Sequence, residues 1–138
     1  MSNKFESSVR QIPFPQQNVY DMLSNLANIE KVRDRIPEEK LKDFKFDNDS
    51  ITVSVAPVGE ISLRIIEREE PKTIKFETEK SPVPFNFWIQ LLPVDDASCK
   101  MKLTIKADLN PFIAGMVKKP LQEGIDKIAD ALQAIQYN

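Results

Sequence analysis

The sequence predicts an α+β fold in which a curved antiparallel sheet of about seven strands grips a long C-terminal helix, with two short helices after the first strand. From residue 43 to residue 107, apolar and polar residues alternate with the period of two that is typical of half-buried strands. Tight turns separate these short segments, which favours antiparallel neighbours. Residues 110–135 then follow the helical period and are long enough to cover the apolar face of the sheet.

Length and composition are typical of one soluble globular domain spanning residues 1–138, with 41% hydrophobic and 29% charged residues. The net charge of −2 and the scattered lysines and arginines argue against nucleic acid as a partner. No apolar run is long enough for membrane insertion, and the start MSNKFESSVRQI lacks the pattern of a secretion signal. A single cysteine, Cys99, fits a reducing compartment, so we expect a cytoplasmic protein.

The chain contains no histidine. This excludes Ser-His-Asp and Cys-His catalysis and the usual histidine-containing zinc sites. The sequence also has no glycine-rich phosphate loop, no pair of cysteines and no GxSxG motif. We therefore predict no catalytic residue, no metal ligand and no cofactor, and an enzymatic role is the less favoured reading.

The N-terminal segment 4–12 predicts a strand, although Phe5, Val9 and Ile12 do not share one parity. Proline residues then break this strand, and Pro15 suits the first turn of a helix. The apolar residues of that helix have helical spacing and are Val19, Leu23 and Leu26. A second short helix is expected within residues 28–42, interrupted at Pro37.

Six further strands are expected at residues 44–47, 51–55, 61–65, 74–77, 85–91 and 99–107. Each has an apolar and a polar face, as expected when only one face of the sheet is covered. The sequences NDS, PVG and EPK supply turns between them. Only the C-terminal helix is long enough to cover the apolar face.

That helix begins with Asn110 as a good N-cap and Pro111 in the first helical position. Its apolar residues form one broad face, with Met116 at the border: Ile113, Val117, Leu121, Ile125, Ile128, Leu132 and Ile135. Gly115 is expected to point outward, whereas Pro120 and Gly124 point inward. Either a bulky sheet side chain packs against these two small residues, or the helix bends at Pro120 and leaves a vacancy. We expect the vacancy.

This order of elements resembles the START-related helix-grip superfamily (SRPBCC), which includes the major birch-pollen allergen and polyketide cyclases. The resemblance covers essentially the whole chain and depends on the layout, on KFESSVRQI leading into FPQQNVYDML, and on the terminal NPFIAGMVKKPLQEGIDKIADAL. It implies an apolar ligand held in a cavity between the sheet and the C-terminal helix. Some members of the superfamily instead act as co-chaperones or have lost the ligand.

The candidate ligand-binding residues are inward positions of the sheet, inward positions of the helix, and two polar residues that would orient a ligand. They are Leu63, Ile65, Phe76, Phe87, Met101, Leu103, Ile113, Met116, Val117, Pro120, Leu121, Gly124, Glu67 and Tyr20. Glu67 and Tyr20 are also the weak candidates for acid–base chemistry in a cyclase-like or dehydratase-like enzyme.

Trp88 is the lone tryptophan, and alternation places it on the solvent face of the sheet. It marks a possible homodimer or partner surface, unless neighbouring lysine stems cover it. Cys99 has inward parity and is expected to be an inert buried thiol.

Three functions therefore stay open: binding of a small hydrophobic or lipid-like molecule, a cyclase-like enzyme, and a protein-interaction module. The sequence does not identify the ligand.

Overall fold

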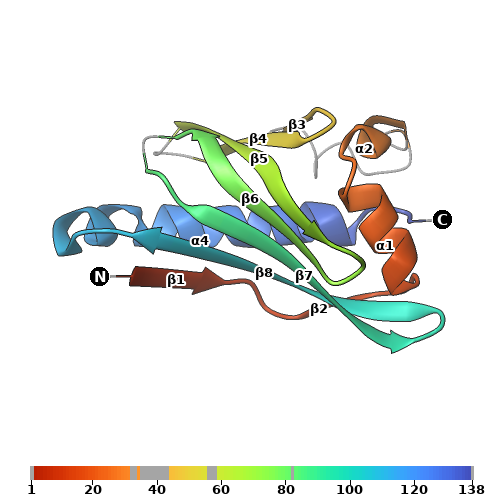
Figure 1. Cartoon of the computed structure of the whole chain (residues 1–138). Helices are drawn as coiled ribbons and strands as arrows, with labels where there is room; N and C mark the ends of the chain where they lie inside the picture. The colour runs from red at the N-terminus through yellow and green to blue at the C-terminus, as the bar shows by residue number, and fades with distance from the viewer. Residues whose placement is uncertain (1, 32–33, 35–43, 56–58, 82, 138) are drawn as a thin grey trace.

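The structure is a computed structural model that describes residues 2–31, 34, 44–55, 59–81 and 83–137 (Figure 1). Its strands are β1 (Ser2–Glu6), β2 (Arg10–Ile12), β3 (Phe44–Phe46), β4 (Ser50–Val55), β5 (Gly59–Glu69), β6 (Thr73–Lys80), β7 (Asn86–Asp95) and β8 (Ser98–Asp108). Its helices are α1 (Gln16–Leu23), α2 (Ala27–Lys31) and α4 (Pro111–Gln133). The α+β class and the long C-terminal helix are thus confirmed.

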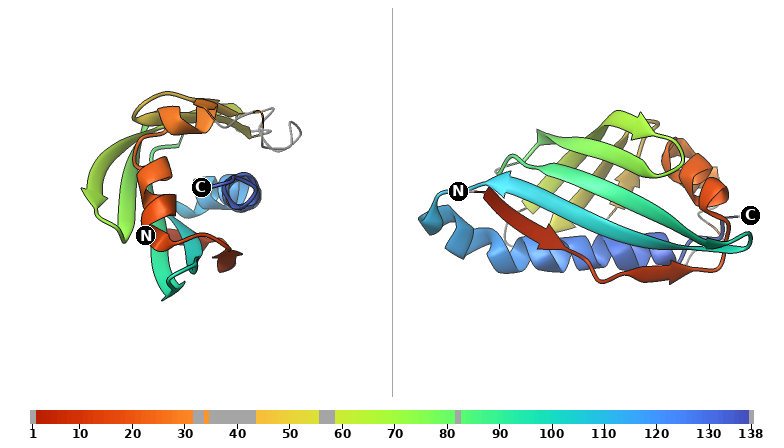
Figure 2. Two further views of the ribbon diagram at one scale, coloured as in Figure 1. Left: turned by 90° about the vertical axis from the view of Figure 1, so that its right-hand side faces the viewer. Right: turned by 60° about the horizontal axis from the view of Figure 1, so that its bottom comes forward.

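All eight described strands form one antiparallel sheet in the order β1-β8-β7-β6-β5-β4-β3, with β2 also paired to β8. The sheet curves around α4, which lies along its concave face (Figure 2). Helices α1 and α2 lie together at one end of the sheet (Figure 1). No described helix is long and apolar enough to cross a bilayer.

The expected first strand is two strands, because the chain leaves the ladder between β1 and β2. At the break, the Ser7 amide donates to the Leu103 carbonyl, and the Ser7 hydroxyl accepts from the Leu103 amide, each at 2.9 Å. Val9 lies in this interruption and is 57% exposed, whereas Phe5 and Ile12 are buried. The break therefore explains why these three apolar residues do not share one parity.

The two short helices fit the prediction where they are described. Helix α1 starts directly after Pro15 and buries Val19 and Leu23. Helix α2 spans Ala27–Lys31 and buries Ile29. The remainder of the expected second helix, including Pro37, lies outside the described residues apart from residue 34.

Strand β5 is longer than the predicted segment 61–65 and contains a β-bulge. Ile65 pairs with Phe76, but Glu67 pairs with Lys75. The chain therefore advances two residues on β5 while it advances one residue on β6. The bulge interrupts the alternation of faces. Ile65 is therefore buried, while Ile66 and Glu67 are both exposed. The prediction that Glu67 faces inward is wrong for this reason.

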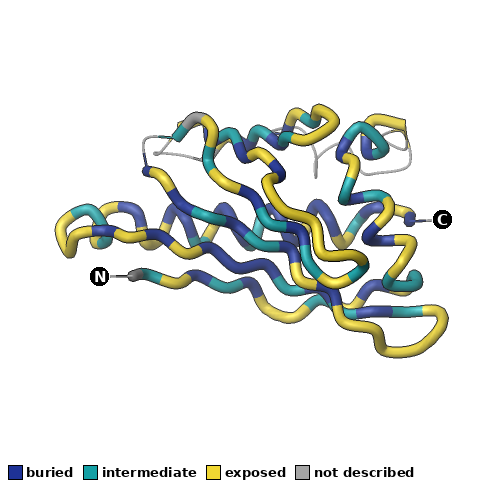
Figure 3. The backbone as a smooth tube through the Cα atoms, viewed as in Figure 1, coloured by how far each residue is buried: buried dark blue, intermediate teal, exposed yellow. Residues whose placement is uncertain are grey.

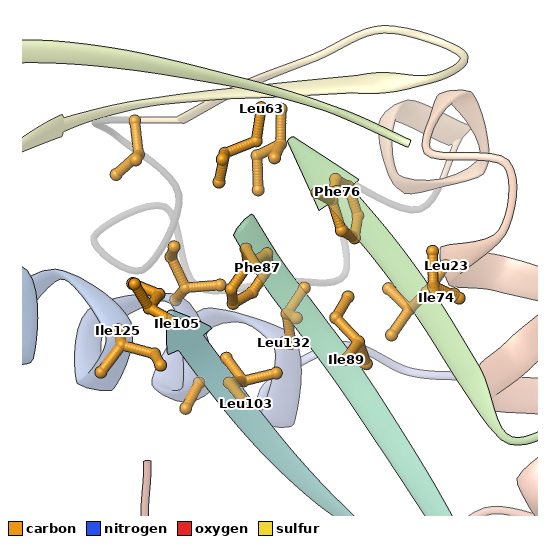
Figure 4. Close-up of a cluster of buried hydrophobic side chains, with 14 of the residues drawn as sticks. Leu23, Leu63, Ile74, Phe76, Phe87, Ile89, Leu103, Ile105, Ile125 and Leu132 are labelled. Carbon is orange, nitrogen blue, oxygen red and sulfur yellow. The ribbon is translucent and has the colours of Figure 1, made fainter. Parts of the chain in front are cut away.

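The concave face of the sheet and the inner face of α4 form one hydrophobic core. Phe76 and Phe87 lie at its centre, both 1% exposed, with their ring centroids 5.2 Å apart. Figure 4 shows these rings side by side, with Leu63 to one side and Leu103 to the other. Figure 3 shows the same burial pattern along the chain: buried positions alternate along the strands of the sheet. The period-two pattern of the sequence thus describes the real core face.

Helix α4 begins as predicted, since the Asn110 side chain accepts a hydrogen bond from the Ile113 amide at 2.9 Å and Pro111 follows it. The helix continues without interruption through Pro120 to Gln133. The predicted inward residues Val117, Leu121 and Ile125 are buried, and so are the later ones, Ile128, Leu132 and Ile135. One face of α4 therefore packs into the core against the sheet.

Two glycines lead to opposite predictions for stability. Gly115 lies on the outer face of α4, and a Cβ added there meets no atom within 4 Å. Gly115→Ala should therefore raise the free energy of unfolding by about 1 kcal/mol, the difference in helix propensity. Gly59 has a φ of +102°, which is strained for any residue with a Cβ. Gly59→Ala should lower the free energy of unfolding by about 1 kcal/mol. Urea denaturation of both variants measures the two changes, and shifts of the same sign would contradict this assignment.

Candidate functional site

The expected binding site lies where Pro120 and Gly124 of α4 face the concave side of the sheet. Both residues are buried, which confirms that they point inward. The described residues that line the remaining space are all apolar: Val53, Ile61, Leu63, Phe85, Ile105, Pro120, Leu121, Gly124 and Ile128. We call this space the α4 seam. It offers an apolar molecule no polar partner among these side chains.

The α4 seam is nearly filled by the side chains that line it. Its volume is about 10 Å³, which is room for about one water molecule. Phe85, which precedes β7 and is 7% exposed, is one of the residues that line this space, as is Gly124. The expectation of a ready-made vacancy is therefore wrong for this space, because its apolar lining leaves almost no free volume.

The second half of α4 is tied to the first two strands by polar side chains. Arg10 of β2 donates to Asp130 at 2.5 Å and to Gln133 at 3.1 Å. Gln122 donates to the Glu6 carbonyl at 2.9 Å, which adds a tie to β1. Residues from Leu121 onward also supply most of the buried face of the helix. This half is therefore held both by apolar packing and by specific hydrogen bonds.

The first half of α4, before Pro120, is much less buried. Phe112 is 77% exposed and Met116 is 61% exposed, while Val117 is buried. The prediction that Met116 borders the inward face is wrong. Met116 precedes Leu121 by five residues, a rotation of about 500°, which leaves it roughly 140° away from Leu121 on that face. Pro120 also lacks the amide that would bond to the Met116 carbonyl, so the junction between the halves is weakened.

The structure brings together only part of the predicted set. Leu63, Pro120, Leu121 and Gly124 meet at the α4 seam. Other predicted residues are buried in the core but do not line this space: Ile65, Phe76, Phe87, Met101, Leu103 and Val117. Ile113 is partly buried against the core. Whether these residues contact a ligand stays a prediction.

Several seam residues were missing from the predicted set: Val53, Ile61, Phe85, Ile105 and Ile128. Each has the inward parity of its strand or helix, so the alternation did mark them as buried. The pairing of Val53 with Ile61 brings two of them side by side. Which buried residues lie opposite Pro120 depends on the register between neighbouring strands, and the alternation in the sequence does not show that register.

The polar candidates lie away from the α4 seam. Glu67 is exposed beyond the bulge of β5. Tyr20 is buried in α1, and burial, followed by the nearby Glu70 charge, raises the pKa of its hydroxyl. No described lining residue of the α4 seam is thus an acid or a base.

One buried polar group was not predicted. The Tyr137 hydroxyl donates to the Leu132 carbonyl at 2.5 Å, and its ring packs edge-on against Phe14 with centroids 6.0 Å apart. Burial raises its pKa well above the usual value, so this hydroxyl stays neutral. Cys99 is also fully buried, and burial raises its pKa, as expected of an inert thiol. Both groups belong to the core.

Trp88 lies on the convex face of the sheet and is half-buried. The ammonium groups of Lys75 and Lys106 lie 5.3 and 5.7 Å from its ring centroid. Lysine side chains therefore cover this tryptophan from two sides, which is the expected alternative to a partner surface. A homodimer through Trp88 stays a prediction.

Known structures share this arrangement of sheet and helix. Norcoclaurine synthase from Thalictrum flavum, as a point mutant with a transition state analogue, aligns with a TM-score of 0.71 at 16% identity, over 96% of this chain and 92% of that one. A START superfamily protein from Mycobacterium smegmatis aligns with a TM-score of 0.65 at 11% identity, over 96% of this chain and 94% of that one. An aromatase/cyclase from a Streptomyces species aligns with a TM-score of 0.65 at 12% identity, over 96% of this chain and 92% of that one. No protein-family model matches the chain, and no curated protein sequence matches it.

The chain thus has the helix-grip fold, and the resemblance to START-related (SRPBCC) proteins is confirmed at the level of the fold. The identities are too low to transfer a substrate or a reaction. The function has to be argued from the site itself.

Proposed function

We propose that the protein binds a small hydrophobic or lipid-like molecule at the α4 seam, between the sheet and α4. The observation that carries this proposal is the placement of two residues without large side chains, Pro120 and Gly124, on the buried face of the helix. They face an entirely apolar lining. Apolar burial would supply the affinity, at roughly 25 cal/mol per Å² removed from water.

Binding requires the α4 seam to open. The volume of about 10 Å³ is far too small for a ligand, since even benzene needs a cavity on the order of 150 Å³. The α4 residues that line the seam are Pro120, Leu121, Gly124 and Ile128. In this proposal α4 therefore separates from the sheet at Pro120 and beyond, where the missing hydrogen bond of Pro120 lets the helix bend.

A cyclase-like reaction is the weaker alternative. Such a reaction needs an acid or a base directed at the bound chain. The described lining of the α4 seam supplies none, and Glu67 and Tyr20 lie elsewhere. We therefore propose a role in binding rather than in catalysis.

The proposal predicts different results for the same substitution at two glycines of α4. Gly124→Leu places an isobutyl group in the α4 seam and should weaken binding of the neutral fluorescent probe phenylnaphthylamine by about tenfold or more, which corresponds to about 1.4 kcal/mol. Gly115→Leu is the matched control, because its side chain enters open space. Fluorescence titration gives both affinities, and thermal melting shows that each variant is folded.

The natural ligand is sought in parallel by native mass spectrometry and solvent extraction of the purified chain. Failure of the wild-type chain to bind the probe or to carry any apolar molecule would overturn the proposal. Equal affinities in the two leucine variants would also overturn it, because the probe would then bind outside the α4 seam.

A further inference from the structure

A second hollow lies on the other face of the sheet, away from α4. It has a volume of about 630 Å³, within the usual range for small-molecule sites. It runs from the turn between β5 and β6, across β7 and β8, to the link between β1 and β2, and its described lining is Val9, Gln16, Pro71, Lys72, Thr73, Gln90, Leu91, Leu92, Pro93, Lys100, Met101 and Lys102. We call it the outer groove. Figure 1 shows the β7–β8 hairpin extending past the β5–β6 turn at this end of the sheet.

The outer groove has an apolar surface that the core does not use. Leu92 is 65% exposed and Val9 is 57% exposed, although both are large aliphatic residues. Pro71 and Pro93 add further apolar surface between them. The exposed stretch at the β7–β8 hairpin is visible in Figure 3. An occupant with an apolar body would remove this surface from water.

The polar groups of the outer groove are mainly hydrogen-bond donors. Its described lining contains three lysines and no Asp or Glu, in a chain with 21 acidic and 19 basic residues. Among the residues that the structure describes, Lys72 and Lys100 have no ion-pair partner, whereas Lys102 pairs with Glu6. The side-chain oxygen of Gln90 accepts from the Thr104 hydroxyl at 2.8 Å. The side-chain NH2 group of Gln90 is then left to donate. This set of donors is complementary to an anion.

Two acidic side chains of the adjoining turns, Glu70 and Asp95, are engaged elsewhere. Glu70 accepts from Gln17 of α1 at 2.9 Å. Asp95 accepts from the Ala97 amide and the Ser98 hydroxyl within its own turn, at 2.8 and 2.9 Å. Neither carboxylate lines the outer groove. An incoming anion therefore replaces no existing partner of Lys72 or Lys100.

We propose that the outer groove binds a small amphipathic carboxylate, such as a medium-chain fatty acid or an aryl carboxylate. The carboxylate contacts Lys72, Lys100 and the Gln90 amide, and the apolar body lies on Leu92 and Val9. This site is independent of the α4 seam, since the two lie on opposite faces of the sheet. Its ligand carries a charge that the α4 seam would exclude.

The test is a titration of the isotope-labelled full chain with sodium octanoate, followed by its amide resonances. Shifts should appear at Gln90, Leu92 and Lys100 and weaken at high salt, as screening requires. Lys72→Gln combined with Lys100→Gln should raise the dissociation constant by roughly five- to tenfold, the value of two exposed charge contacts. Lys31→Gln combined with Lys45→Gln is the matched control, because these exposed lysines lie on α2 and β3.

Octanol distinguishes a carboxylate site from an apolar surface that adsorbs any alkyl chain. Because it lacks the charge, octanol should shift the same resonances at least several-fold more weakly. Octanol binding as tightly as octanoate, or an unchanged affinity of the Lys72/Lys100 double variant, would overturn the proposal. Shifts confined to residues of the α4 seam would also overturn it, while leaving the proposed function intact.

Vesicles distinguish a soluble ligand from a membrane surface. Co-sedimentation of the chain with phosphatidylglycerol vesicles, without any shifts on addition of octanoate, would assign the outer groove to a membrane surface. That result would contradict a site for a soluble carboxylate.

Discussion

Phe76→Ala is expected to lower the free energy of unfolding by about 3–5 kcal/mol, the usual loss for a buried phenylalanine. The ring is 1% exposed and contacts Phe87 with centroids 5.2 Å apart, so its removal leaves a cavity that the surrounding sheet cannot close. Domains of this size have a total stability on the order of 5–15 kcal/mol. Urea denaturation followed by circular dichroism measures the change.

Phe112→Ala is the matched control for this experiment. It removes the same side chain from α4, where the ring is 77% exposed, and should change stability by less than about 0.5 kcal/mol. Phe76→Leu provides an intermediate variant in case the alanine variant does not fold. A loss near 1 kcal/mol for Phe76→Ala would contradict the packed core and would indicate an open cavity around Phe76.

Ser7→Ala is expected to lower the free energy of unfolding by about 2 kcal/mol. Ser7 is 5% exposed, and its hydroxyl is the acceptor for the Leu103 amide at 2.9 Å. Alanine would leave this buried N–H without a partner, which costs about 1–3 kcal/mol. Chemical denaturation measures the loss, and faster hydrogen exchange at the Leu103 amide would locate it.

The neighbouring Ser8 supplies the control. Its side chain is exposed, and among the described residues it accepts from Arg10, at 2.9 Å near the surface. Ser8→Ala should change stability by less than about 0.5 kcal/mol. Equal effects at the two serines would show that the break between β1 and β2 does not depend on the Ser7 hydroxyl.

Sequence patterns predicted the elements of this fold well because they report burial. Alternation identified the strands β3 to β8, and the helical period identified the buried face of α4, from Val117 to Leu132. The local signals at the start of α4, Asn110 and Pro111, also act as expected. These features depend on residues close in sequence, so one chain is enough to detect them.

The candidate site was less predictable because it depends on register and on side-chain packing. A single bulge after Ile65 reversed the orientation expected for Glu67. Apolar side chains, Phe85 among them, leave only about 10 Å³ beside Pro120 and Gly124, and no periodicity shows which buried residues pack there. The outer groove was missed because Leu92 and Val9 look like ordinary apolar residues until their exposure is known.

The pairing of β8 with β1 and β2 has a consequence for how the chain folds. Phe5 pairs with Ile105, so the first strand cannot join the sheet until the last strand has been synthesised. Helix α4, which covers the concave face, comes later still. During synthesis on the ribosome the apolar face of the sheet therefore exists before its cover. Such non-local closure is slow and leaves apolar surface exposed in the intermediates until α4 packs onto the sheet.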